Sequence, residues 1–92
     1  MKIINWNAEK NQLLISEWGV SFEDILFALQ SGAVLDDVYH PNNGKYAHQR
    51  VFVVNVNDYA YLVPYVETST DIFLKTIIPS RKATKKYLRG GE

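Results

Sequence analysis

The chain has 92 residues, of which 47% are hydrophobic and 22% are charged, and its formal net charge at pH 7 is zero. This length predicts one domain over residues 1–92, because two domains would each be too small to bury a core, and the composition excludes a disordered chain. The absence of cysteine excludes disulfides, thiolate nucleophiles and cysteine-based zinc sites. No apolar run approaches the roughly 18 residues that span a bilayer, and the first ten residues lack the apolar stretch of a secretory signal, so we expect a cytoplasmic protein.

The zero net charge conceals two regions of opposite charge. Residues 1–74 carry nine acidic and four basic side chains, a net charge of −5. Residues 75–92 carry six basic side chains and one acidic side chain, a net charge of +5. Charge divided in this way favours an anionic partner for the C-terminal end, and the alternative is a basic helix face that contacts only solvent.

The N-terminal third predicts a short strand and two helices. Residues 2–6 indicate an opening strand, and Asn7 is a typical N-cap for a helix over about residues 8–18. A second helix follows a capping box that begins at Ser21, with acidic residues in the first turn where the helix dipole favours them. Its apolar residues recur at i, i+3, i+4 and i+7, and Gly32 ends it.

The middle of the chain changes to a strand pattern. The predicted strands cover residues 34–39, 50–56, 59–63 and 71–78. Asn57 and Asp58 predict a two-residue hairpin, and Pro64 requires an edge position or a bulge. We therefore predict an α+β fold with an antiparallel sheet of about four to five strands and the helices on one face.

A short basic helix over Arg81 to Arg89 is the most informative segment, followed by a frayed tail at residues 90–92. Its first turn holds Arg81 and Lys82, although the positive end of the helix dipole disfavours cations unless an anion lies nearby. Free N–H groups, the Ser80 hydroxyl and Arg81 together would form a phosphate site. Alternatively, Ser80 only caps the helix and the cations face solvent.

Histidines, acids and tyrosines offer weaker candidates. His40 and His48 flank a Pro-Asn-Asn-Gly loop, and either could be a general acid or base or an exposed residue without a role. Their spacing does not match a metal site. Neighbouring strand positions place Asp36 and Asp37 on opposite faces, which makes them a poor catalytic dyad. The strand tyrosines could stack on nucleic-acid bases, but packing is the favoured role.

Four segments of the chain together resemble one protein family. They are Ile4-Asn5-Trp6-Asn7-Ala8-Glu9-Lys10-Asn11, Gly19-Val20-Ser21-Phe22-Glu23-Asp24, Gln49-Arg50 and Ile77-Ile78-Pro79-Ser80-Arg81-Lys82-Ala83-Thr84. In this order and spacing they resemble the BrnT family, which are toxins of type II toxin–antitoxin systems. The resemblance covers about residues 4–88. It implies a RelE-like fold and a ribonuclease that inhibits translation without a metal or cofactor.

The resemblance also implies partners and site residues. The partners would be a DNA-binding antitoxin in a hetero-oligomer and RNA, either free or on the ribosome. Arg50 and Arg81 would form a catalytic clamp on the phosphate, with His48 or Tyr87 transferring a proton. The predicted RNA- and phosphate-binding residues are Lys10, Ser80, Lys82, Lys85 and Lys86. Gln49 stands where the family tends to have an acid, so no general base is assigned.

Two other functions stay open at this level. A ParE-like toxin of the same architecture would bind DNA gyrase without catalysis. A small interaction module would use the basic C-terminal helix to bind an acidic partner.

Overall fold

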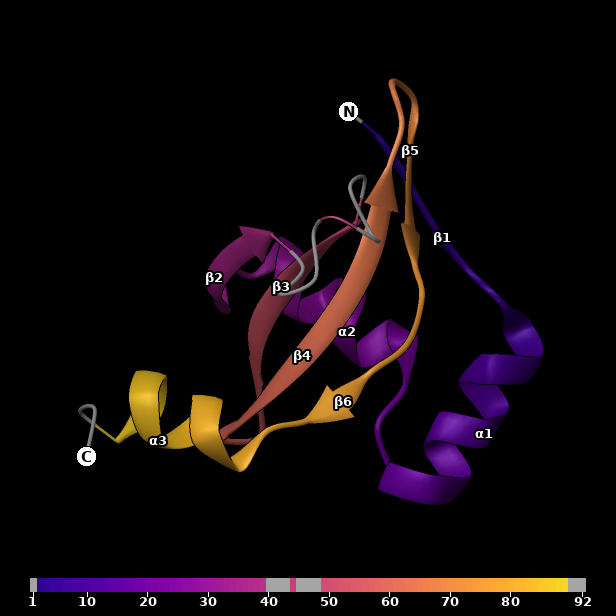
Figure 1. The fold of residues 1–92 in the computed structure, drawn as a ribbon. Coiled ribbons are helices and arrows are strands. Elements are labelled where there is room, and N and C mark those ends of the chain that lie inside the picture. The colour runs from indigo at the N-terminus through magenta and orange to yellow at the C-terminus, as the bar shows by residue number, and fades with distance from the viewer. Residues whose placement is uncertain (1, 40–43, 45–48, 90–92) are drawn as a thin grey trace.

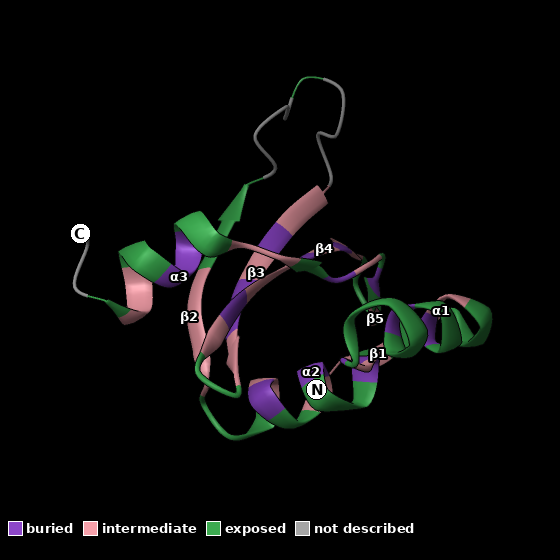
Figure 2. Ribbon diagram, turned by 90° about the horizontal axis from the view of Figure 1, so that it is seen from below, coloured by how far each residue is buried: buried purple, intermediate pink, exposed green. Residues whose placement is uncertain are grey.

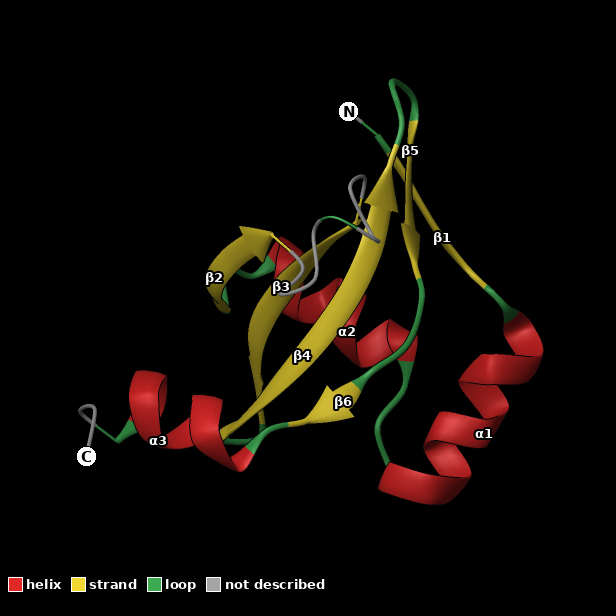
Figure 3. Cartoon of the chain, in the orientation of Figure 1, coloured by secondary structure: helices red, strands yellow, loops and turns green. Residues whose placement is uncertain are grey.

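The computed structural model describes residues 2–39, 44 and 49–89, and its elements follow the predicted order with one short strand added (Figure 1; Figure 3). The elements are β1 (Ile3–Trp6), α1 (Ala8–Trp18), α2 (Phe22–Gln30), β2 (Val34–Tyr39), β3 (Gln49–Val56), β4 (Tyr59–Glu67), β5 (Asp71–Leu74), β6 (Ile78–Pro79) and α3 (Arg81–Leu88). The α+β class is confirmed.

Local hydrogen bonds explain where the N-terminal helices begin. The Asn7 side chain accepts from the Lys10 N–H at 2.9 Å and caps α1. Before α2, the Ser21 hydroxyl accepts from the Asp24 N–H at 3.1 Å, and the Asp24 carboxylate accepts from the Ser21 N–H at 2.9 Å. Gly19 ends α1 with a φ of 69°, a left-handed conformation that glycine adopts without strain. Both predicted starts are confirmed.

The sheet is mixed, whereas hairpin spacing had predicted an antiparallel one. The strand order is β1-β5-β4-β3-β2, and β6 also pairs with β4. β1 runs parallel to β5, with Ile3 opposite Asp71 and Trp6 opposite Leu74. A parallel pair needs a long crossover connection, and the whole chain from α1 to β4 supplies it. The prediction failed because β1 has no hairpin partner next to it in the sequence.

β3 and β4 form the predicted hairpin. Asn57 and Asp58 adopt φ angles of 54° and 66°, as a type I′ turn requires. β4 then runs through Pro64, which we had expected at an edge or bulge and which lies in an interior strand. The Pro64 carbonyl accepts from the Lys75 N–H at 2.8 Å, so the proline nitrogen points to the same side of the strand. Proline has no N–H to donate to a neighbouring strand. This costs no strand pairing at Pro64, because on that side it lies opposite the interval between β5 and β6.

That interval divides the strand predicted over residues 71–78. β5 pairs with the last residues of β4, and β6 pairs with Tyr61 and Leu62, which lie nearer the start of β4. Between them the chain turns Ile77 into the core, where its side chain is 1% exposed. The apolar pattern correctly indicated burial, but it did not show that the chain would move along β4 between two pairings.

Buried residues on both faces of β3 require cover on both sides of the sheet. Val54 belongs to the larger core cluster, together with residues of α1 and α2. The adjacent Val53 faces the other way and packs with Ala83 of α3. α1 and α2 therefore cover one face and α3 covers part of the other, which corrects the prediction that all helices share a face (Figure 2).

Candidate nucleic-acid interface

Helix α3 is fixed to the sheet through its first turn. The Ser80 hydroxyl accepts from the Ala83 N–H, and the Ser80 N–H donates to the Ala60 carbonyl, both at 3.0 Å. The Thr84 hydroxyl accepts from the Ala60 N–H at 2.9 Å and donates to the Ser80 carbonyl at 2.8 Å. Ser80 is therefore the N-cap residue of α3, and the capping role predicted as one alternative is confirmed.

Four basic side chains of α3 and the arginine at its C-cap cover the outer side of the helix. They are Arg81, Lys82, Lys85, Lys86 and Arg89. With 3.6 residues per turn, these positions span an arc of about 140° opposite the side that packs on the sheet. All five are exposed, and none forms an ion pair with a carboxylate among the described residues. The first turn contains no acidic residue, so no carboxylate there offsets the cations or the positive end of the helix dipole. Positive charge concentrated in this way attracts anions.

A groove of about 330 Å³ lies between α3 and the sheet, and we call it the α3 groove. Its floor is aliphatic, and its sides carry two lysines, a serine and a tyrosine. The lining residues are Val38, Val53, Leu62, Ser80, Lys82, Ala83, Lys86 and Tyr87. The groove thus combines an apolar floor with part of the basic arc.

Tyr87 is held at the groove by an aspartate of the edge strand β2. Its hydroxyl donates to Asp36 Oδ2 at 2.6 Å, and Asp36 Oδ1 accepts from the Asp37 N–H at 2.8 Å. The hydrogen bond from Tyr87, followed by that from the Asp37 N–H, lowers the pKa of Asp36. The same bond raises the pKa of Tyr87 above its ordinary value. At neutral pH the pair is therefore a phenol hydrogen-bonded to a carboxylate.

Arg50 takes part in a separate charge network. Its Nη2 lies 2.6 Å from Asp37 Oδ2, and its Nη1 lies 3.5 Å from Glu67 Oε1. Lys2 Nζ lies 2.6 Å from Glu67 Oε2 and, ahead of Arg50, lowers the pKa of that carboxyl. The two acids and two bases compensate one another. Arg50 therefore connects β2, β3 and β4, and its charge is not free for a phosphate.

Aromatic rings enclose the same network. The Arg50 guanidinium carbon lies 5.7 Å from the ring centroid of Tyr39 and 5.8 Å from that of Tyr65. Tyr65 stacks on Phe52 with centroids 4.0 Å apart, and its hydroxyl donates to Asp37 at 2.7 Å. Burial, followed by this hydrogen bond, raises the pKa of Tyr65. The tyrosine is 1% exposed, so it packs the core and does not present a ring for base stacking.

The predicted clamp of Arg50 and Arg81 is not assembled. Arg50 precedes Asn55 by five residues along β3, about 16 Å, and Asn55 pairs with Ala60, where α3 is attached. Arg50 also faces away from α3, because side chains alternate along a strand and Val53 is the residue that packs on Ala83. The local pattern could not reveal this, since facing and distance depend on the register of β3.

The other predicted site residues lie in three different parts of the chain. Lys82, Lys86 and Tyr87 line the α3 groove, and Lys85 lies on the same basic arc. Lys10 lies on α1, which is well separated from α3 (Figure 1). His40 and His48 lie outside the described residues.

Asp36 was not among the predicted site residues. The prediction that Asp36 and Asp37 point to opposite faces of the sheet is confirmed, since Asp36 contacts Tyr87 of α3 and Asp37 contacts Arg50 on the other face. A register shift between Val34 and Asp36 sets this orientation. The hydrogen bond joins Asp36 to a tyrosine 51 residues later in the chain, so no local sequence pattern could have indicated it.

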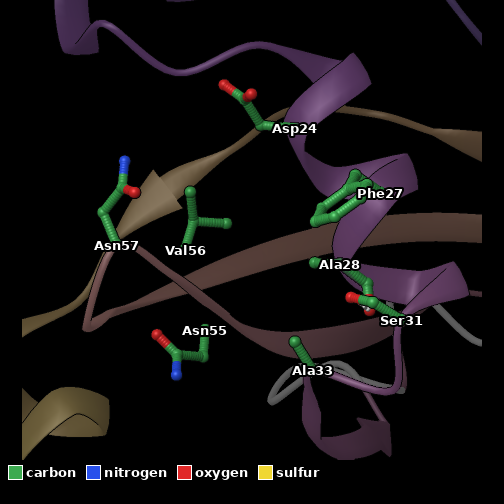
Figure 4. Close-up of a pocket in the computed structure, with 8 residues that line it drawn as sticks. All are labelled: Asp24, Phe27, Ala28, Ser31, Ala33, Asn55, Val56 and Asn57. Atoms are coloured by element: carbon green, nitrogen blue, oxygen red, sulfur yellow. Dashed lines mark hydrogen bonds between the residues drawn. The ribbon is translucent and has the colours of Figure 1, made fainter.

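A second pocket, of about 210 Å³, lies between α2 and the β3–β4 hairpin (Figure 4). Its lining is Asp24, Phe27, Ala28, Ser31, Ala33, Asn55, Val56 and Asn57. Asp24 already accepts a hydrogen bond in the capping box, and the Asn55 amide points away from Phe27. The polar groups therefore do not converge as they would around a specific ligand.

Other classes of site find no support in the part of the chain that the structure describes. There, no three His, Asp or Glu side chains gather closely enough to hold a metal ion. The helices in those residues are too short or too polar to cross a membrane. Comparison of the chain with protein-family models, curated proteins and solved structures gave no match.

Proposed function

We propose that this chain is the toxin of a type II toxin–antitoxin system, a BrnT-like ribonuclease with a RelE-like fold that acts on RNA in the cytoplasm. The observation that carries the proposal is the basic arc of α3, which borders a groove where Asp36 holds Tyr87. A nucleic-acid backbone is the anion that best suits a row of cations that form no ion pair with the described residues.

The same residues offer a route to RNA cleavage without a metal. Such cleavage requires a base for the 2′-hydroxyl, cations beside the phosphorane and an acid for the leaving oxygen. The Tyr87 hydroxyl donates a hydrogen bond to Asp36. In the reaction the Tyr87 oxygen would accept the proton of the 2′-hydroxyl, and the Tyr87 proton would pass to Asp36. The 2′-oxygen then bonds to phosphorus and the bond to the 5′-oxygen breaks. Arg81 and Lys82 would stabilise the charge, and Lys86 or water would protonate the 5′-oxygen.

The resemblance of four segments to the BrnT family supports the remaining parts of the proposal. A DNA-binding antitoxin would neutralise this chain in a hetero-oligomer, and translated RNA would be its target. Arg50 enters only as a residue that positions Asp37, because its charge is already compensated.

Cleavage of single-stranded RNA by the purified chain in EDTA tests the catalytic part. We expect Tyr87→Phe to lower the rate by about 10²–10⁴-fold, as loss of a proton-transfer group does. Tyr39→Phe is a matched control, because Tyr39 is 69% exposed on the face away from α3. A chain that cleaves no RNA, or cleaves it equally well without the Tyr87 hydroxyl, contradicts the proposal.

A non-catalytic, ParE-like action on gyrase is the second candidate. Large apolar side chains are exposed on the N-terminal helices, with Trp18 51% and Phe27 72% exposed, as in protein-binding surfaces. Pulse-labelling after induction of the chain in bacteria separates the two functions. Protein synthesis should stop first if RNA is the target, whereas early failure of DNA synthesis would favour gyrase. If neither changes while soluble chain accumulates, an interaction module replaces both.

A further inference from the structure

The face of the sheet that carries α3 is only partly covered. The strand register places apolar side chains of all six strands on this face. The exposed members are Ile3 (63%), Val38 (37%), Phe73 (37%) and Ile78 (44%). The half-buried Leu62, Pro64 and Val66 lie between them in β4. An apolar surface that joins several strands marks an interaction site more often than scattered single residues do.

Basic side chains border this apolar face. Lys82 and Lys86 line the α3 groove, and Lys75 Nζ lies 5.8 Å from the ring centroid of Phe73. Asp36 contributes one negative charge close to Lys86, which leaves a net positive charge on the three lysines. Asp71 lies on the same face at the far end of β5 from the α3 groove. The ligand that matches this surface has apolar groups flanked by negative charges.

We propose that the α3 groove and the adjoining apolar face bind an acidic amphipathic segment of a partner protein. Its aliphatic or aromatic side chains would contact Val38 and Leu62, and its carboxylates would pair with Lys82 and Lys86. RNA would satisfy the lysines, but its polar sugar–phosphate backbone would gain nothing from the aliphatic floor. A segment bound there also covers Tyr87 and blocks RNA, a consequence that rests on the proposed function.

Selection from a display library of random 16-residue peptides on the folded chain tests this inference directly. We expect enriched peptides with excess Asp and Glu alongside apolar residues. Fluorescence anisotropy of one selected peptide then measures the variants. We expect Lys82→Gln/Lys86→Gln and, separately, Val38→Ser to weaken binding by about tenfold or more.

Matched controls place the same changes elsewhere on the surface. Gln12→Glu/Gln30→Glu alters the net charge by the same −2 on α1 and α2, and Ile15→Ser removes a side chain of α1 that is 42% exposed. We expect both to bind the peptide within about twofold of the unchanged chain. Circular dichroism establishes that each variant is folded before it is measured.

Three outcomes overturn the inference: no enriched peptides, peptides without acidic excess, or binding as sensitive to the controls as to the groove variants. RNA cleavage is measured on the same samples, which separates the two proposals. Acidic peptides that bind the groove of a chain without ribonuclease activity support the surface and refute the toxin chemistry. Cleavage of RNA by a chain that selects no peptide refutes the surface alone.

Discussion

Asp36 and Asp37 are neighbours in the sequence, yet each fixes a different tyrosine on a different face of the sheet. Asp36 accepts from Tyr87 at 2.6 Å beside α3, and Asp37 accepts from Tyr65 at 2.7 Å beside Arg50. Alternation along the strand thus allows one dipeptide to serve two sites. The first pair lies in the proposed active groove, and the second pair fixes the framework behind it.

This division predicts independent effects on the two tyrosines. Asp36→Asn removes the carboxylate that stabilises the protonated phenol, so the pKa of Tyr87 should fall toward about 10. Asp37→Asn is the matched control, which should lower the pKa of Tyr65 and leave that of Tyr87 unchanged. NMR titration of ¹³Cζ-labelled tyrosines measures both. A Tyr87 pKa that does not respond to Asp36→Asn would show that the hydrogen bond is absent.

Individual carboxyl groups also predict that the fold loses stability in acid. The pKa values of Glu23, Asp36 and Glu67 are lowered in the folded chain, chiefly by hydrogen bonds from Asn11, Tyr87 and Lys2 respectively. In acid the unfolded chain therefore binds more protons than the folded chain. These groups stabilise the fold above the ordinary carboxyl pKa of about 4, and their contribution is lost as the pH falls through the folded-state values.

A change of Lys2 isolates one of these contributions. Lys2→Met should reduce the difference in unfolding free energy between pH 7 and pH 3, because the pKa of Glu67 then moves back toward its usual value. Lys10→Met is the control, since no ion pair of Lys10 occurs among the described residues. Urea denaturation at both pH values measures the difference. An equal change in the two variants would contradict the role of Lys2.

At the level of elements, one threonine contributes a buried hydrogen bond to the docking of α3. Thr84 is 3% exposed, and its hydroxyl is the partner of the fully buried Ala60 N–H. Thr84→Val keeps the shape but leaves that N–H without an acceptor, so the free energy of unfolding should fall by about 1–3 kcal/mol. Thr70→Val, at an exposed turn, should change it by about 0.5 kcal/mol or less.

Hydrogen exchange gives the Thr84 prediction a local test. The Ala60 N–H should exchange faster in Thr84→Val, because the start of α3 is no longer tied to β4 through this bond. Urea denaturation measures the global change in the same variant. Unchanged exchange together with unchanged stability would show that α3 is held mainly by its apolar side chains.

The elements show what can and cannot be predicted from the sequence. Capping residues, the Asn57-Asp58 turn and the periodicity of α2 reflect interactions between near neighbours in the sequence. The helix starts and the hairpin were therefore predicted correctly from them. The parallel pairing of β1 with β5 and the separation of Arg50 from α3 depend on strand partners far along the chain. Asn11 shows the same limit, because it accepts from the Phe22 N–H and donates to Glu23 across the junction of α1 and α2.

For the whole molecule, the net charge of zero is the sum of separate acidic and basic regions. The four cations of α3 and its C-cap Arg89 lie on one exposed arc, while Arg50 and Lys2 form ion pairs on the other face of the sheet. Net charge predicts no attraction to RNA, whereas the local field of α3 predicts a strong one. The basic residues of the C-terminal sequence were therefore a better guide to the candidate site than the total charge.

The salt dependence of RNA binding decides between these two expectations. Each phosphate contact in single-stranded RNA contributes about −0.7 to the slope of log K against log salt concentration, so five contacts would give about −3.5. Arg81→Gln should make this slope less steep by about 0.7, and Gln12→Glu on α1, with the same change in net charge, should leave it unchanged. Anisotropy titrations of a single-stranded RNA in increasing KCl measure both. A slope near zero, or equal effects of the two variants, would mean that α3 does not hold the RNA backbone.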